Sequence, residues 1–140
     1  MLKKEFLLVW MISSLTMLGM SYVWHGIILN DYRFIKLPFI SFILLQGIVY
    51  AVIGFVLTFV YHYTNINRKV KYKGFMMGAV LGFFIYLIAY VLGISFKTGE
   101  FNYVIVVDFL WQMGEQALGG GVVGFAFVVL ERVEKLADVS

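Results

Sequence analysis

The chain alternates between long apolar runs and short polar connections. The apolar runs cover 6–29, 38–61, 74–96 and 103–130, and each is long enough for a helix to cross a bilayer, which takes about 20 residues. The short connections make consecutive helices antiparallel neighbours. The pattern therefore predicts an all-α membrane protein, an antiparallel bundle of four transmembrane helices that forms a single integral membrane domain over 1–140.

The composition supports this class. Hydrophobic residues make up 62% of the chain and charged residues 14%, whereas soluble domains carry about 25% charged residues. The absence of cysteine excludes disulfides, thiolate metal sites and cysteine nucleophiles. The first run exceeds the apolar stretch of a signal peptide, about 7–15 residues, so we interpret it as a retained span rather than a cleaved signal.

The basic residues indicate an orientation. With four spans, both termini and the middle connection share one side of the membrane. That side carries eight basic residues, Lys3, Lys4, Arg68, Lys69, Lys71, Lys73, Arg132 and Lys135, and the other side carries three, Arg33, Lys36 and Lys97. The positive-inside rule then predicts a bacterial-type cytoplasmic membrane with both termini cytoplasmic. Basic residues spread over several connections do not form the continuous surface that nucleic-acid binding requires.

An internal repeat would add a level of organisation. A shift of the chain by half its length aligns Gln46 with Gln116, and Gly54-Phe55 with Gly124-Phe125. The bundle could then consist of two tandem helical hairpins, related by an axis along the membrane normal. Apolar sequences also match by chance, so a bundle without a repeat stays open.

Glycines mark the closest helix pair. They recur every four residues in the third run and again in the fourth, and small residues at this spacing let helix backbones approach in a membrane. The expected helix-packing residues are Gly74, Gly78, Gly82, Gly120 and Gly124. As an alternative, the triple glycine at 119–121 could break the fourth helix and free carbonyls for an ion.

Two carboxylates lie inside the fourth run. Asp108 and Glu115 are seven residues apart, which places them near one helix face, with Gln112 between them. An ionised carboxylate at bilayer depth costs about 2.5 kcal/mol or more. A chain that retains two such groups is expected to use them, and desolvation makes the deeper Glu115 the better candidate to stay protonated.

Other polar residues are expected at similar depths in the outer half of the bundle, where they would join the carboxylates in a polar column. Gln116 is also expected there. The candidates for binding a ligand or a proton are Asp108, Glu115, Gln112, His25, Gln46 and Ser21. Chains of Asp, Glu and His in membranes are typical of proton relays and ion paths. A hydrogen-bonded network that only fixes the helix register is the alternative.

The sequence lacks the motifs of common enzymes, such as G-x-S-x-G, H-E-x-x-H and the P-loop, so no catalytic residue and no cofactor are predicted. An enzyme that acts on a lipid or a quinone stays open as a third, weaker hypothesis, because no catalytic pair is evident. A metal ion shared by His25, Asp108 and Glu115 is not expected, because the two carboxylates differ in depth. The leading hypothesis is a transporter or channel subunit that binds or passes a proton, a cation or a small polar ligand. The alternative is a non-transporting accessory or assembly subunit. Under either hypothesis, the expected partners of the protein are the lipid bilayer and either further copies of the chain or a larger membrane protein.

Overall fold

The computed structural model describes residues 4–34, 36–64, 72–91 and 103–137. These residues form four long helices and include no strand, which confirms the predicted all-α class for the described part of the chain. The long helices are α1 (Lys4–Ser21), α2 (Phe39–Tyr63), α3 (Lys73–Val91) and α4 (Tyr103–Ala137). A π-helical segment, Tyr22–Ile28, continues from α1, and a 3₁₀ helix, Asp31–Phe34, lies in the connection to α2.

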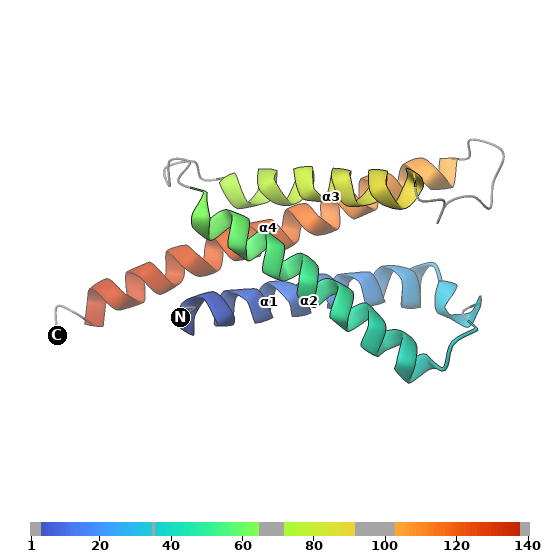
Figure 1. Cartoon of the computed structure of the whole chain (residues 1–140), viewed down its shortest axis with the longest axis horizontal. Helices are drawn as coiled ribbons and strands as arrows, with labels where there is room; N and C mark the ends of the chain where they lie inside the picture. Colours follow the sequence, from blue (N-terminus) through green and yellow to red (C-terminus); the bar gives the residue numbers. More distant parts are fainter. Residues whose placement is uncertain (1–3, 35, 65–71, 92–102, 138–140) are drawn as a thin grey trace.

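Consecutive helices run in opposite directions (Figure 1). The most extensive contact is between α3 and α4, and α1 packs against both α2 and α4. Helix α2 crosses the others obliquely (Figure 1). The first turn of α1 and the last turn of α4 lie at the same end of the molecule, and the α1–α2 connection lies at the opposite end (Figure 1).

Each long helix, with the π-helical segment counted as part of the first, is long and apolar enough to cross a membrane. The helices follow the predicted runs closely, but the end of the third run, 92–96, lies outside the described residues. Helix α4 continues past the predicted end at 130 to Ala137, because charged residues and leucine there are good helix formers. It is also continuous through the triple glycine, so the alternative of a broken helix at 119–121 is wrong.

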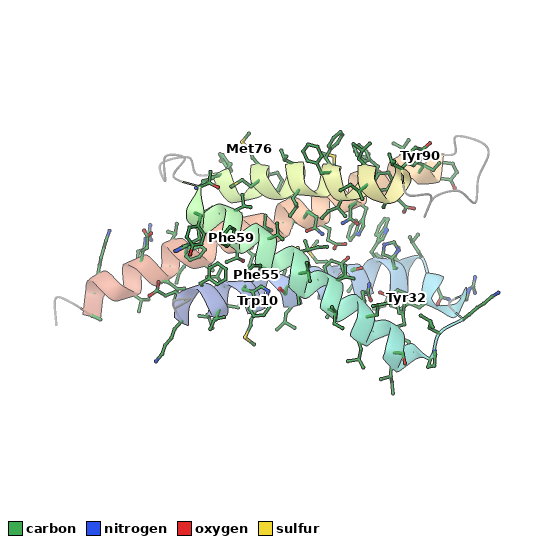
Figure 2. All side chains as sticks on the ribbon, viewed as in Figure 1. Trp10, Tyr32, Phe55, Phe59, Met76 and Tyr90 are labelled. Carbon is green, nitrogen blue, oxygen red and sulfur yellow. The ribbon has the colours of Figure 1, made fainter. Side chains whose placement is uncertain are left out.

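The interior is small, and large apolar side chains cover the outside. The buried apolar cluster contains Val9, Met17, Tyr50, Leu57 and Val123, contributed by α1, α2 and α4. Outward-facing residues such as Ile40 and Phe125 are more than 70% exposed. Figure 2 shows Met76 and Tyr90 on the outer side of α3, away from the other helices.

Candidate functional site

Glycines bring α3 and α4 into backbone contact. A Cβ added to Gly78 would overlap the backbone carbonyl of Gln116, and Gly74 and Gly120 would each overlap the other's carbonyl. A Cβ added to Gly82 would lie 2.7 Å from the carbonyl oxygen of Gln112. These contacts fix the height of the two glutamines of α4 against α3. Gly124 differs, because its Cβ position faces Tyr61 of α2, at 3.4 Å from the hydroxyl.

A cavity of about 440 Å³ lies among the end of α1, the π-helical segment, the 3₁₀ helix, α2, α3 and α4. Its lining combines apolar residues of α2 and α3 with polar side chains from five elements. The polar lining residues are Ser21, His25, Tyr32, Gln46, Tyr50 and Gln112. Four of the residues predicted from the sequence, Ser21, His25, Gln46 and Gln112, are therefore brought to one cavity.

Gln46 of α2 links the cavity wall to two other segments. Its Nε2 donates a hydrogen bond to Ser21 Oγ at 2.9 Å, and its Oε1 accepts one from the Tyr32 hydroxyl at 2.9 Å. Figure 2 shows Tyr32 beside the first half of α2, near the α1–α2 connection. Both ends of the amide are thus engaged, which holds the α1–α2 connection against α2.

Tyr50 continues this chain toward the interior. It lies one turn after Gln46 on the same face of α2, and its hydroxyl interacts with Ser21 and with Glu115 of α4. A phenol has one proton, so Tyr50 can donate to the carboxylate and accept from the Ser21 hydroxyl. Polar side chains therefore follow one another from Tyr32 to Glu115, across α1, α2 and α4.

Glu115 is 1% exposed and is held by donors from two helices. Trp111 Nε1 donates to Glu115 Oε2 at 3.0 Å, and Gln116 Nε2 lies 3.4 Å from Glu115 Oε1. With Tyr50 these are three donors, and all three are neutral. The indole of Trp111 is itself fixed, since it stacks on Trp24 of the π-helical segment.

Asp108 lies apart from the cavity. It is half-buried on α4, is not among the described residues that line the cavity, and interacts electrostatically with Tyr86 of α3. The Tyr86 hydroxyl donates to the backbone carbonyl of Ile105 at 2.9 Å, which keeps that ring beside α4. The structure thus places the two carboxylates of the predicted column in different surroundings, Glu115 near α1 and α2 and Asp108 near α3.

Sequence reasoning missed Tyr32, Tyr50 and Trp111 as site residues, because aromatic residues in and beside apolar runs are usual at membrane interfaces and in packing. One signal was available for two of them. Tyr50 follows Gln46 by four residues and Trp111 precedes Glu115 by four, so each shares a helix face with a predicted polar residue.

The cavity has room for a small polar solute, and Tyr50 of its lining connects it to the buried carboxyl group of Glu115, which is not itself among the described residues that line the cavity. Among the residues that the structure describes, no group of three or more His, Asp or Glu side chains is placed to hold a metal ion. No protein-family model matches the chain, and comparisons with curated proteins and with solved structures find no significant match.

Proposed function

We propose that the chain is a multi-pass membrane protein that binds or passes a proton, a cation or a small polar solute through the cavity and Glu115. The exposed apolar faces of four helices that are each long enough to span a bilayer support membrane insertion. In water such faces would promote aggregation, whereas lipid tails solvate them.

The proposed orientation has both termini in the cytoplasm of a bacterial-type membrane. It rests on the excess of basic residues at the termini and in the middle connection. The cavity is lined by His25 and Tyr32 near the α1–α2 connection, at the end of the molecule opposite the termini (Figure 1). In this orientation the cavity lies toward the outer side of the membrane.

The observation that carries the proposal is the line of polar side chains that leads from Tyr32 through Gln46, Ser21 and Tyr50 to the buried carboxyl group of Glu115. A network that served only to fix the helix register would not need an ionisable group, because neutral amides and hydroxyls suffice for that. A carboxylate held by neutral donors at bilayer depth remains costly until a positive charge reaches it. The geometry therefore favours a cationic species, including a proton, as the ligand.

A liposome assay tests the proposal. Purified protein is reconstituted into liposomes that contain a pH-sensitive dye. A proton gradient is imposed in either direction, and the response of the dye is compared with and without added cations. We expect Glu115→Gln to reduce the flux at least tenfold. Glu131→Gln, the same substitution on α4 but far from the cavity, is the matched control and should retain it. Equal flux through the wild type and Glu115→Gln would refute the proposal.

The same variants separate transport from an accessory role. An accessory subunit would show no flux in liposomes, and it would purify from mild detergent in constant ratio with one larger membrane protein. A transporting protein would purify alone or as a homo-oligomer and would retain its flux after reconstitution.

A further inference from the structure

Gln116 carries a buried polar atom that the hydrogen-bond chain does not use. Its side chain is 0% exposed, and among the described residues no donor reaches its Oε1. The other end of the same amide, Nε2, points to Glu115 Oε1, but at 3.4 Å this hydrogen bond is long. A buried amide oxygen without a donor is unfavourable, and more so in a membrane, where water cannot replace the donor.

The fold makes room for this amide. Gly82 of α3 lies against Gln116, and a Cβ added there would come within 3.1 Å of the glutamine's Cβ. Gly78 likewise leaves space for the Gln116 backbone. Two glycines thus allow a polar side chain to sit at the closest helix contact, where an apolar residue would pack more simply.

A proton on Glu115 would supply the donor that Gln116 Oε1 lacks. A carboxylic acid and a primary amide can pair through two hydrogen bonds: the acid O–H donates to the amide oxygen, while the amide N–H donates to the acid carbonyl. In the structure the N–H side of this pair already faces the carboxyl group. Rotation about the side-chain bonds of both residues would bring the acid O–H to the amide oxygen and complete the pair.

We propose that Glu115 and Gln116 form a single proton-binding unit, in which the amide of Gln116 holds the protonated carboxyl group through two hydrogen bonds. The inference rests on the proposed function and names its ligand as the proton. Gln116 acts here as a positioning residue, since it binds the carboxyl group rather than the transported species.

Few titratable groups surround this unit. Tyr50 of α2 faces Glu115 directly, and His25 and Tyr32 line the same cavity. On the α3 side, Tyr86 interacts with Asp108, which lies two turns from Glu115 on α4. His25 is the only imidazole among the described residues that line the cavity, so the measurement is repeated in a His25→Gln background.

Infrared spectroscopy of the protein in lipid tests the inference. The absorption of the protonated carboxyl group is followed against pH, and Glu115→Gln identifies the band. We expect Gln116→Met to lower the midpoint of protonation by about one pH unit, a tenfold loss in proton affinity. The matched control is Thr58→Val, which removes a buried hydroxyl of α2 that has no partner among the described residues. It should leave the midpoint unchanged.

Three results would overturn the inference: an unchanged midpoint in Gln116→Met, an equal shift in Thr58→Val, or a midpoint that moves when sodium replaces choline. The last would indicate a metal cation at Glu115 in place of the proton. If Gln116→Met fails to fold, the inference is tested by thermal unfolding of the wild type and of Glu115→Gln at different pH values. Acidification should then stabilise the wild type but leave Glu115→Gln unaffected, and equal pH dependence would overturn the inference.

The outcomes also separate this inference from the proposed function. If Gln116→Met lowers the midpoint of protonation as expected but the wild-type protein shows no flux, the proton-binding unit is supported and transport is rejected. If the flux depends on Glu115 but the midpoint of protonation is the same in Gln116→Met as in the wild type, transport is supported and the proton-binding unit is rejected.

Discussion

The indole rings of Trp24 and Trp111 stack face to face, with centroids 4.2 Å apart and planes inclined by 8°. Trp24 belongs to the π-helical segment and Trp111 to α4, so the stack joins these two elements beside the polar network. Trp111 also donates a hydrogen bond to Glu115. The position of the π-helical segment therefore affects where the Trp111 indole lies relative to the carboxylate.

This stack should appear as a coupling energy in unfolding. A double-mutant cycle with Trp24→Ala and Trp111→Ala is expected to give about 0.5–1.5 kcal/mol of interaction, the range for aromatic pairs. Denaturant unfolding in detergent measures it. Trp10, which contacts α2 through Ala51 and Phe55, provides the control: Trp24→Ala and Trp10→Ala should be additive. A cycle that gives no coupling between Trp24 and Trp111 would contradict the stacked geometry.

The contact between α3 and α4 should tolerate no side chain at Gly78. We expect Gly78→Ala to lower the free energy of unfolding by about 1–3 kcal/mol, the usual cost of overpacking, because the new Cβ meets backbone atoms of Gln116 and Ala117. Gly114→Ala is the matched control, since no atom lies within 4 Å of its added Cβ. There the gain in helix propensity should stabilise by about 0.5–1 kcal/mol. Equal effects of the two substitutions would argue against the close contact.

Ser21 should contribute more than an ordinary hydroxyl in a helix. Ser21→Ala removes the acceptor for Gln46 Nε2 and the donor for Tyr50, and leaving such groups unpaired costs about 1–3 kcal/mol. Thr16→Val is the comparison, because the Thr16 hydroxyl bonds only within its own helix, to the Ile12 carbonyl. Thermal unfolding should separate the two variants clearly. A larger loss of stability in Thr16→Val than in Ser21→Ala would contradict the role of Ser21 between Gln46 and Tyr50.

Lys73 should stabilise the junction of α2 and α3. Its buried ammonium group donates to the backbone carbonyls of Thr64 at 2.6 Å and Tyr61 at 3.3 Å, at the C-terminal end of α2. It also lies 4.7 Å from the centre of the Tyr61 ring. Charged hydrogen bonds of this kind contribute about 1.5–3 kcal/mol, so Lys73→Met should destabilise by that order. Lys135→Met, in the last turn of α4, should have little effect in the same unfolding assay.

The absence of cysteine makes the topology easy to test. A single cysteine introduced at Lys135 should react only with reagents that reach the cytoplasm, and one introduced at Lys36 only with reagents outside. Labelling of intact cells with a membrane-impermeant maleimide measures this. The reverse pattern would invert the proposed orientation, and labelling of both positions from one side would contradict four spans.

The helix positions could be predicted because an apolar run as long as the bilayer is thick is a strong signal on its own. The π-helical segment Tyr22–Ile28 could not be predicted in this way. A helix that is apolar all round has no polar stripe to establish a period, so the change in helical repeat after Ser21 leaves no mark in the pattern. The continuation of α4 to Ala137 was missed for the opposite reason, since hydropathy falls there although the helix does not end.

The site could be predicted in part. Ser21, Gln46 and Gln112 stand out because polar residues in apolar runs are few, and the structure brings them to one cavity. The surroundings of Asp108 required knowledge of how the helices cross. One face of α4 meets α1 and α2 near Glu115 but α3 near Asp108, and residue spacing along a single helix does not show that change.

The hydrogen bonds of the cavity all point the same way. Tyr32 donates to Gln46, Gln46 to Ser21, Ser21 to Tyr50, and Tyr50 to Glu115. The chain therefore has a polarity that ends at the carboxyl group. A hydroxyl has a single proton to direct, so Tyr50 can donate either to Glu115 or to Ser21 but not to both. The state of the carboxyl group thus decides which of these two neighbours receives the proton of the Tyr50 hydroxyl.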